Sequence, residues 1–556
     1  MKSNQLRKEF LDFFQKKGHK IVHSSSLLPS DPSVLLTTAG MQQFKPFYLG
    51  KESPYGRNVA SCQKCFRTSD IEEVGDISHL TFLEMLGNFS FGGYFKEEAI
   101  ELAYNFLFKQ LKLPLEKAFF TVFRGDKNVP QDEESILIWK KLGVPESKIK
   151  KYGGEDNFWG PTGKEGPCGP NTEIHINNVE IWNLVFNEYF QDEKGKLTSL
   201  DKKGVDTGMG LERLAMISQE KDNVFETDLF SPINDLINNK SKKTEKAFRI
   251  IADHIRGAVF LISEGVLPSN MEEGYILRRV LRRAIRYGRI IEAEPGFLIP
   301  LANKVIETYK DVYPELFSKQ AEILTVIQKE EEKFEKSLEK GITATSSDLI
   351  KGDLSGKQAF DKYQSYGFPI EMIREMAEEK GRKVDIEGFQ EELKKHQEIS
   401  RAGKEKKFGG GGEFSPQLHT ATHLLHAALR KVLGEQVKQM GSDINLERLR
   451  FDFSFSRKLS PEEIKKVEDL VNEIIKKDLE VKKEEMSLDK ALESGALAFF
   501  KEKYPEKVNV YSIQGFSKEI CAGPHIERTN QLGKFKIIKE ESSSAGVRRI
   551  KAILER

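Results

Sequence analysis

Four consecutive glycines at 409–412, within KEKKFGGGGEFSP, constrain the fold of this chain more than any other feature. Glycine has no side chain to pack and loses the most backbone entropy on folding, and the charge run before the glycines favours solvation. Such a segment can neither enter a core nor hold a helix, so it predicts a Gly-rich linker over 406–414. A chain of 556 residues with such a break is too long for one compact core and should form several domains.

The patterns on the two sides of the linker predict three domains. Residues 1–240 mix short helices with many short β-rich runs and glycine clusters, which indicates an α+β domain with functional loops. From 241 to 405 apolar residues recur at helical spacing, as in FRIIADHIRGAVFLI, which predicts a helical domain. After the linker, Ser415 and Pro416 are suited to begin a helix, and strand-like runs such as RLRFDFSF follow. Residues 415–556 should therefore form a second α+β domain.

A helix is predicted at the N-terminus, over 3–17. Its apolar side chains recur on one face, and Gly18 stands where a C-terminal cap belongs. The apolar positions are Leu6, Phe10, Phe13 and Phe14.

Composition excludes several classes of protein. Apolar residues are 38% and charged residues 31%, which supplies a core and excludes a disordered or fibrous chain. No stretch approaches the ~18 consecutive apolar residues of a spanning helix, and MKSNQLRKEF becomes charged too early for a signal peptide. The net charge of +1 argues against general coating of nucleic acid or of a membrane, but it leaves room for a local basic patch. We therefore expect a cytoplasmic protein with no membrane partner.

Two segments of the first domain carry residue types suited to a phosphorylated ligand. Arg67 lies in a predicted hairpin, where a planar guanidinium can hold a phosphate through two hydrogen bonds. In VDTGMGLERLAMI, Asp206 can bind an amino group, the glycines allow close approach to the backbone, and Arg213 can contact another phosphate. Taken alone, Arg67 is more often a surface ion-pair partner and a Gly-Met-Gly turn before a helix is usually just a turn, so neither segment identifies a site by itself.

Six motifs in order resemble the catalytic domain of alanyl-tRNA synthetases, which are class II aminoacyl-tRNA synthetases. The resemblance continues through PSN, GYILRRVLRRAIRYG, HTATHLLH and GVRRI, and it covers essentially the whole chain. The six motifs are SSSLLPSDPSVLLTTAGMQQFKPFYLG, FLEMLGNFSFGGYFK, NFW, GPCGP, EIWNLVF and DTGMGLER.

The resemblance implies an antiparallel class II sheet with flanking helices. It also implies an enzyme that activates L-alanine with ATP and Mg²⁺ and transfers it to tRNA(Ala). Arg67 would contact the α-phosphate, Asp206 the alanine ammonium and Arg213 the far phosphates. The other implied pocket residues are Met85, Trp159, Asn183, Val185 and Gly208. Without the resemblance, core packing would be the better interpretation of Met85 and Trp159.

The loop TSDIEEV after Arg67 departs from the family pattern. Many relatives are longer here and carry an additional basic residue. The resemblance therefore leaves open what this loop contacts on ATP or on the tRNA end.

Cys62 and Cys65 form a CxxC motif, but a structural zinc site needs four ligands and no second CxxC lies nearby. His79 and Cys168 are the nearby candidates to complete such a site. Within the resemblance both are ordinary residues near the pocket, so we favour no metal here. With only four cysteines, a disulfide framework is excluded as well.

A run of arginines in GYILRRVLRRAIRYGR recurs at one-turn spacing, with scarcely an acidic residue between 274 and 290. This pattern predicts a cationic stripe on one side of a helix and favours phosphate binding over a merely solvated face. The arginines are Arg278, Arg279, Arg282, Arg283, Arg286 and Arg289.

The resemblance also implies recognition of the G3·U70 pair in the acceptor stem through an Asn and an Asp. Asn270 matches the first position, and Gln364 stands at the second. An amide both donates and accepts hydrogen bonds, whereas a carboxylate only accepts them. We therefore expect acceptor-stem recognition with an altered identity contact.

His419 and His423 lie one turn apart on the helix after the linker, so both imidazoles can reach one metal ion. Cys521 and His525 supply a thiolate and a third imidazole, which makes a Cys/His₃ set suited to Zn²⁺. A helical His pair alone is more often incidental, but the family's editing domain uses this pairing. The resemblance also places Gln439 near the hydrolytic pocket, and we interpret His426 as structural.

An editing site has a physical reason. A pocket sized for alanine cannot exclude glycine, and an apolar pocket rejects serine only about 10²-fold. Hydrolysis of Ser-tRNA(Ala) and Gly-tRNA(Ala), with Gln439 and Cys521 at the editing site, would supply the missing discrimination. Ala-Gly-Pro stands between Cys521 and His525 where the family usually has Gly-Gly-Thr, which leaves the ligands intact and the editing rate open.

Family members generally continue into a C-terminal oligomerisation domain, and the resemblance ends here at GVRRIKAILER. We therefore expect a short form, natural or truncated, that acts as a monomer. The alternative is a catalytically inactive RNA-binding paralogue, against which the intact Arg67, Asp206 and Arg213 argue. A ligase that loads alanine onto another carrier would have no evident use for an editing domain.

Overall fold

The computed structural model describes residues 1–29, 34–161, 163–237, 245–405, 415–445, 447–455, 457–497, 507–521, 523–544 and 547–555. The predicted linker over 406–414 lies outside these residues. The described contacts divide the chain into two compact units. Unit 1 is Met1–Ser347 with Lys362–Met372, and unit 2 is Asp348–Asp361 with Ile373–Arg556. The predicted boundary at 240 falls inside unit 1, so a separate helical domain stays a prediction.

Unit 1 is built on a nine-stranded sheet in the order β1-β2-β3-β9-β8-β7-β4-β5, with β6 paired to β7. The pairs from β2 to β4 are antiparallel, and only the two outermost pairs, β1 with β2 and β4 with β5, are parallel. The strands are β1 (Lys20–Ile21), β2 (Asn58–Phe66), β3 (Phe82–Phe91), β4 (Ala118–Phe123), β5 (Ile149–Tyr152), β6 (Phe158–Trp159), β7 (Gly166–Ile176), β8 (Val179–Gln191) and β9 (Leu197–Gly210).

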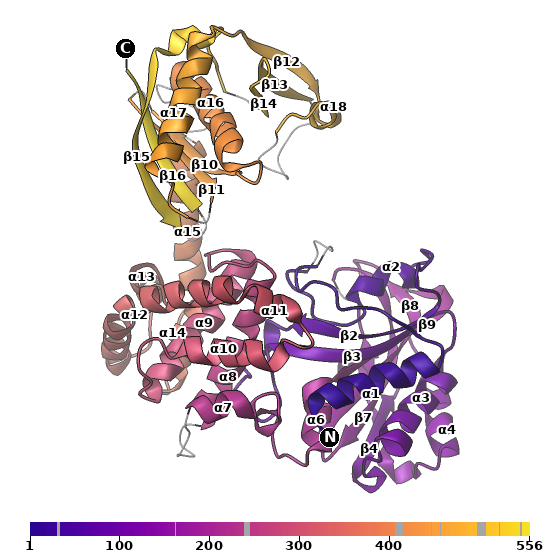
Figure 1. The fold of residues 1–556 in the computed structure, drawn as a ribbon. Helices are drawn as coiled ribbons and strands as arrows, with labels where there is room; N and C mark the ends of the chain where they lie inside the picture. Colours follow the sequence, from indigo (N-terminus) through magenta and orange to yellow (C-terminus); the bar gives the residue numbers. More distant parts are fainter. Residues whose placement is uncertain are drawn as a thin grey trace. The chain divides into compact units, whose positions relative to one another are not determined.

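Helices α1 and α6 lie over the same face of this sheet (Figure 1). As predicted, α1 buries its phenylalanines, and Phe10 contacts Trp182 of β8 with ring centroids 5.8 Å apart. The chain then turns at Gly18, whose φ of +84° favours glycine. The helices of this region are α1 (Ser3–Lys16), α2 (Lys45–Tyr48), α3 (Lys96–Tyr104), α4 (Glu133–Lys141), α5 (Gly154–Asn157), α6 (Leu211–Ser218) and α7 (Ser231–Ile237).

Buried ion pairs attach these helices to the sheet. Arg7 of α1 donates to both carboxylate oxygens of Glu84 on β3, at 2.9 and 2.7 Å. Arg256, from the helix over Glu245–Ser263, donates to Glu212 of α6 at 2.8 Å, and Glu212 also accepts from the backbone N–H of Glu84 on β3 at 3.2 Å. Because all four groups are buried, losing one partner would leave a charge uncompensated in the core.

The segment from 245 to 405 is helical, as predicted. Its first helix packs against the sheet, where the rings of Phe82 and Phe260 stack with centroids 3.9 Å apart. The helices are α8 (Glu245–Ser263), α9 (Glu272–Ile290), α10 (Leu298–Tyr309), α11 (Pro314–Ser318), α12 (Gln320–Lys351), α13 (Gly356–Tyr366), α14 (Ile370–Glu378) and α15 (Ile386–Glu405). No helix in the described part of the chain is both long and apolar enough to span a bilayer.

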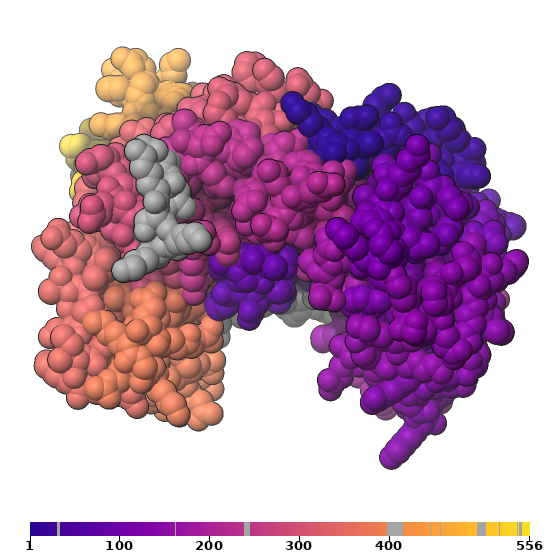
Figure 2. Space-filling view, turned by 90° about the horizontal axis from the view of Figure 1, so that it is seen from below, coloured from indigo at the N-terminus to yellow at the C-terminus, as the bar shows by residue number. Residues whose placement is uncertain are grey.

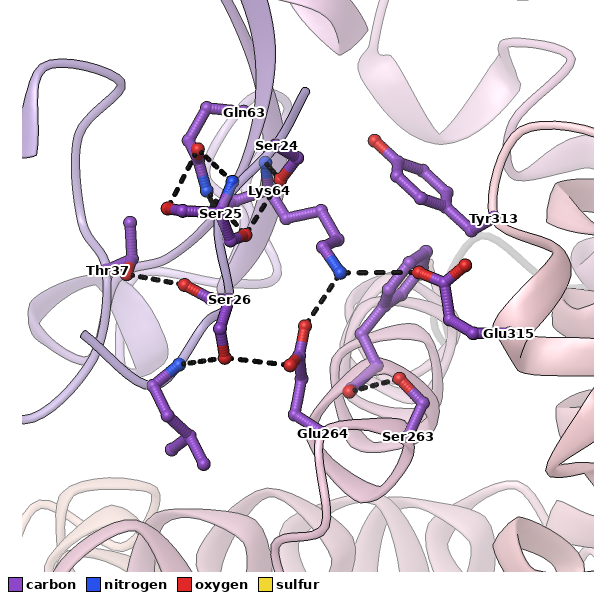
Figure 3. Close-up of polar contacts among 12 residues, drawn as sticks. Ser24, Ser25, Ser26, Thr37, Gln63, Lys64, Ser263, Glu264, Tyr313 and Glu315 are labelled. Atoms are coloured by element: carbon purple, nitrogen blue, oxygen red, sulfur yellow. Dashed lines mark hydrogen bonds and ion pairs between the residues drawn. The ribbon is translucent and has the colours of Figure 1, made fainter. Parts of the chain in front are cut away.

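Lys64 of β2 ties the sheet to these helices (Figure 3). Its ammonium forms ion pairs with Glu264, just after α8, at 2.7 Å and with Glu315 of α11 at 3.4 Å. The hydroxyl of Ser26 also donates to Glu264, and the backbone N–H of Lys64 donates to the hydroxyl of Ser24. These contacts hold Ser24 and Ser26 beside β2 and Glu264.

Unit 2 contains two smaller sheets and a long helix. As predicted, α16 begins at Pro416, with the hydroxyl of Ser415 accepting from the backbone N–H of Leu418. The strand orders are β10-β11-β16-β15 and β12-β13-β14. The elements are α16 (Pro416–Leu433), β10 (Gln439–Ile444), β11 (Leu449–Ser454), α17 (Pro461–Lys476), β12 (Val481–Ser487), α18 (Leu488–Glu493), β13 (Lys507–Ile513), β14 (Ser517–Ile520), β15 (Lys534–Ser544) and β16 (Val547–Glu555).

Candidate active site and candidate metal centre

The strand register brings most of the predicted pocket residues onto one face of the nine-stranded sheet. Asp206 of β9 lies directly opposite Val185 of β8, and Gly208 lies opposite Asn183. Met85 of β3 pairs with Gly210 at the end of β9. Opposed residues in antiparallel strands project to the same face, so these positions form one continuous surface.

Met85 reaches across β9 because Gly208 has no side chain. A Cβ at Gly208 would lie 3.0 Å from Sδ of Met85, closer than such atoms normally approach. The same sulfur lies 3.2 Å from the backbone N of Gly40, in the segment that covers this face. The glycine therefore permits the close approach of the Met85 side chain to β9.

Asp206 is a buried acidic residue on this surface. Its side chain is buried, and among the described residues the carboxylate has no ion pair or hydrogen bond with another side chain. Burial raises its pKa to about 7. A buried carboxylate of this kind is poised to bind a cationic group, because a positive partner would compensate the cost of its desolvation.

Sequence reasoning missed two polar residues of β7 that support the predicted pocket. The Asn171 amide donates to the Asn183 carbonyl oxygen at 2.7 Å, and Glu173 accepts from the Asn183 amide at 3.3 Å. Glu173 also pairs with His175 at 2.9 Å. The alternation of NTEIHI was the available signal, because it places Asn171 and Glu173 on one face of a strand.

Arg67 is half-buried and lies just beyond the end of β2. Its backbone N–H donates to Thr81 O at 2.8 Å, and its Nε donates to Thr38 O at 3.3 Å. Burial raises the pKa of the neighbouring Cys65 thiol to about 12, while Arg67 lowers it and Asp206 raises it. The charges of Arg67 and Asp206, the two predicted ligand-binding groups, therefore both act on the Cys65 thiol of β2.

Arg213 and Trp159 are the two remaining residues of the predicted pocket. Arg213, in the first turn of α6, donates to the Glu180 carboxylate at 3.0 Å, so its guanidinium is already bound to a protein group. Trp159 lies on β6 opposite Gly169, with 38% of its surface exposed. It is therefore not packed in the core.

The CxxC cysteines project to opposite faces of β2. Cys62 Sγ lies 3.6 Å from Glu84 on the face covered by α1, whereas Cys65 belongs to the apolar cluster around Phe44 and Phe89. Two residues three positions apart in a strand cannot share a ligand. This arrangement agrees with the interpretation that the motif is not a metal site.

Most arginines of the predicted cationic stripe on α9 are buried, so phosphate binding by this stripe stays a prediction. Arg279, Arg282, Arg283 and Arg286 are each less than a tenth exposed. Arg282 pairs with Glu330 at 2.6 Å, and Arg279 pairs with Glu72 and Glu371. These acidic partners come from distant parts of the sequence, so the pattern of the helix alone could not reveal them.

The exposed residues beside α9 are a smaller set. Asn270 and Gln364 are exposed, as is Arg289 near the end of the helix. Arg278 is half-buried and donates to the side chain of Asn270 and to Pro268 O. Arg278, a predicted phosphate ligand, therefore holds Asn270, which is predicted to contact the acceptor stem.

In unit 2 the four predicted metal ligands come together. One candidate ligand atom from each of His419, His423, Cys521 and His525 lies within 4.8 Å of those of the others. Cys521 Sγ is 3.2 Å from His419 Nε2. Gln439 lies on β10, where its amide donates to Ser442, and it is not among these four.

The imidazoles are oriented by bonds to their Nδ1 atoms. Nδ1 lies 3.1 Å from Pro524 O in His419 and 3.0 Å from Thr420 Oγ1 in His525. In His423, Nδ1 lies 3.4 Å from the Glu519 carboxylate. His525 Nε2 is buried without a hydrogen-bond partner among the described residues. These orientations turn Nε2 of His419 toward Cys521 Sγ and leave Nε2 of His525 for a ligand, as in protein zinc sites.

The electrostatics also fit a metal. Burial, with His423 beside it, lowers the pKa of His419 to about 4. Burial likewise lowers the pKa of His525 to about 2 and that of His423 below its usual value. The rings are therefore neutral at pH 7, which metal binding requires. Glu519 is buried between His423 and His426, and it accepts from His426 Nδ1 at 3.0 Å.

Two models of known families match the chain. The model described as tRNA synthetases class II (A) matches residues 5–461. The model described as Threonyl and Alanyl tRNA synthetase second additional domain matches residues 508–551, which include Cys521 and His525.

Curated relatives match along the whole chain. Alanine--tRNA ligase of Borreliella afzelii (strain PKo) is 47% identical over 595 residues, covering 100% of both proteins. The Treponema pallidum (strain Nichols) protein of the same name is 45% identical, covering 100% of this chain and 98% of its own. That of Dehalococcoides mccartyi (strain CBDB1) is 37% identical, covering 100% of this chain and 80% of its own. The chain therefore belongs to the alanyl-tRNA synthetase family of class II tRNA synthetases.

Proposed function

We propose that this chain uses ATP to attach L-alanine to tRNA(Ala) through an alanyl-adenylate. The observation that carries the proposal is the 45–47% identity, over essentially the full length of both proteins, to curated alanine--tRNA ligases. The buried Asp206 on the pocket face supports it, because that carboxylate suits the ammonium group of an amino acid.

Positioning and charge compensation would perform the chemistry. Asp206 holds the alanine ammonium, and Arg67 contacts the α-phosphate while the alanine carboxylate attacks it in line. Met85, Trp159, Asn183, Val185 and Gly208 would bind the adenylate. Arg213 would have to exchange Glu180 for a phosphate. Mg²⁺ bound with ATP would neutralise the departing pyrophosphate.

Alanine-dependent exchange of radiolabelled pyrophosphate into ATP tests this function directly. We expect exchange with alanine, weaker exchange with serine and glycine, and charging of tRNA(Ala) only when ATP is present. A folded wild-type protein without alanine-dependent exchange would instead support the inactive RNA-binding paralogue.

For the acceptor stem, we propose contacts from Asn270, Arg278 and Gln364. We expect Gln364→Ala to lower kcat/KM for tRNA(Ala) about 10-fold, because it removes a hydrogen bond to a base. Gln364→Asp should retain charging, since the carboxylate still accepts. Exchange without tRNA should be unchanged in both variants. The exposed neighbour variant Ser365→Ala is the control, and an equal loss in it would contradict a specific contact.

We propose that unit 2 edits Ser-tRNA(Ala) and Gly-tRNA(Ala) with Zn²⁺ held by His419, His423, Cys521 and His525. The ligand set and the free Nε2 atom of His525 support this assignment. A zinc ion would order the tRNA 3′ end or polarise a water. Gln439 would lie near the hydrolysed bond.

Glu519→Gln is expected to weaken zinc binding about 10- to 100-fold. The carboxylate orients His423 and makes its ring a better ligand, as such partners do in other zinc sites. Zinc affinity is measured by competition with a chromogenic chelator. Glu527→Gln removes an exposed carboxylate two residues after His525 and serves as the control. Equal affinities in the two variants would contradict the role of Glu519.

Because its substrates are soluble, we further propose a cytoplasmic enzyme without a membrane partner. We also propose that it is a monomer, which sedimentation velocity can test.

A further inference from the structure

The loop between β2 and β3 is tied at its base to Arg67. The Arg67 N–H donates to Thr81 O at 2.8 Å, so the two ends of the loop are joined. Near its start the loop forms a short 3₁₀ turn over Ser69–Ile71. Any displacement of this loop would therefore reach Arg67 through the backbone.

Buried side chains of α8 and α9 hold this loop from outside. Arg283 of α9 donates to Ile71 O at 2.7 Å and to Val74 O at 3.4 Å. At the base, both the backbone N–H and the hydroxyl of Thr81 donate to Asp253 of α8, at 2.9 and 2.6 Å. In Figure 2 a violet patch, in the colour of this part of the chain, borders magenta atoms.

His254 connects these two attachments. Its Nε2 lies 3.0 Å from Arg283 Nη1, and its Nδ1 lies 2.8 Å from Asp253. Because arginine can only donate a hydrogen bond, Nε2 of His254 accepts from Arg283. The proton of the imidazole ring is therefore on Nδ1, which donates to the Asp253 carboxylate. A chain of hydrogen bonds therefore runs from Thr81 through Asp253, His254 and Arg283 to Ile71. The loop backbone between Ile71 and Thr81 closes this chain into a ring.

The ring is buried throughout. Thr81, Asp253 and His254 are fully buried, and Arg283 is 6% exposed. In such surroundings each polar group depends on its partners, since an unpaired one costs more than in water. Buried networks with every member bonded hold one geometry strongly.

We propose that Arg283, acting through this ring, is a positioning residue for Arg67 in amino-acid activation. The proposal rests on the proposed function, in which Arg67 contacts the α-phosphate of ATP. Loss of the Arg283 guanidinium frees Ile71 O and Val74 O and lets the loop move. Arg67 then meets ATP less often in the productive position. The alanine site on β9 has no member in the ring, so alanine binding is spared.

The test compares KM for ATP with KM for alanine in tRNA-independent pyrophosphate exchange. Arg283→Gln is expected to raise KM for ATP at least 10-fold and to change KM for alanine less than 2-fold. Thr81→Val removes only one hydroxyl from the ring, keeps the shape of the core, and should raise KM for ATP several-fold. Arg382→Gln, which changes an exposed arginine outside the ring and outside the α9 stripe, should match the wild type.

Two results would overturn the proposal. One is an unchanged KM for ATP in folded Arg283→Gln and Thr81→Val proteins. The other is an equal rise of both KM values, which would indicate general damage. Weakened tRNA binding with intact exchange would support a phosphate-binding stripe and would also overturn it.

Calorimetric titration with Mg-ATP separates this proposal from the proposed function. If the wild type shows no alanine-dependent exchange, the proposed function fails. The ATP affinities of the wild type and of Arg283→Gln then decide whether the ring positions Arg67. At least a 10-fold weaker affinity in the variant supports the ring, and equal affinities refute it.

Discussion

Asp206→Asn is expected to abolish alanine-dependent pyrophosphate exchange, with a loss of at least about 10³-fold, which corresponds to about 4 kcal/mol. The amide has nearly the shape of the carboxylate but no charge, so the alanine ammonium would be buried without a counterion. Asp201→Asn, which changes an exposed residue of the same strand, is the matched control. Exchange within 10-fold of the wild type in a folded Asp206→Asn protein would refute the assignment.

The same variant should be more stable than the wild type at high pH. Burial raises the pKa of Asp206 from 3.8 to about 7, so the folded protein holds this proton more tightly than the unfolded chain. Its contribution to stability is therefore largest below about pH 4 and is lost as the pH rises to about 7. Above that, the wild type carries a buried, uncompensated charge that Asn lacks.

Thermal unfolding at two pH values measures this effect. The quantity to compare is the midpoint temperature of unfolding of Asp206→Asn minus that of the wild type. This difference should be a few degrees larger at pH 8 than at pH 5. Equal differences at the two pH values would show that burial does not raise the pKa of the Asp206 carboxylate.

Cys521→Ser is expected to have the largest effect in unit 2. It should lower zinc content well below one ion per chain and slow deacylation of Ser-tRNA(Ala) at least about 10²-fold, because the thiolate is the only charged ligand of the four. Three imidazoles remain, so residual zinc is expected. Alanine activation should stay at the wild-type level.

Elemental analysis and deacylation assays on the same preparations test this expectation. His396→Gln removes an exposed imidazole outside the metal cluster and should change neither quantity. Normal deacylation by zinc-free protein would show that editing does not need the metal. Loss of alanine activation would show that the two chemistries are not independent.

Local patterns predicted the parts of this molecule that local interactions determine. The first helix and its turn at Gly18 follow from apolar spacing and a cap, and α16 follows from Ser415 and Pro416. The four metal ligands could be named because helical spacing supplies one pair, a short motif supplies the other, and the family resemblance joins the two. The structure confirms that all four come together.

Features that depend on pairing between separate segments could not be predicted in this way. The α9 arginines look like an exposed cationic surface until Glu72 and Glu330 are placed beside them. Glu173 gains its role only when the register sets it opposite Asn183. The acidic partners of the α9 arginines are far away in the sequence, whereas Asn183 is only ten residues from Glu173 and meets it only in the register of the β7–β8 hairpin.

The buried arginines of α9 also limit how this protein can change during evolution. Arg282 and Glu330 form a pair that one substitution breaks and only a second one restores, so relatives should alter the two positions together. Transplanting α9 alone from a distant relative should give an insoluble chimaera. Moving Glu72, Glu330 and Glu371 with the helix should recover a folded one.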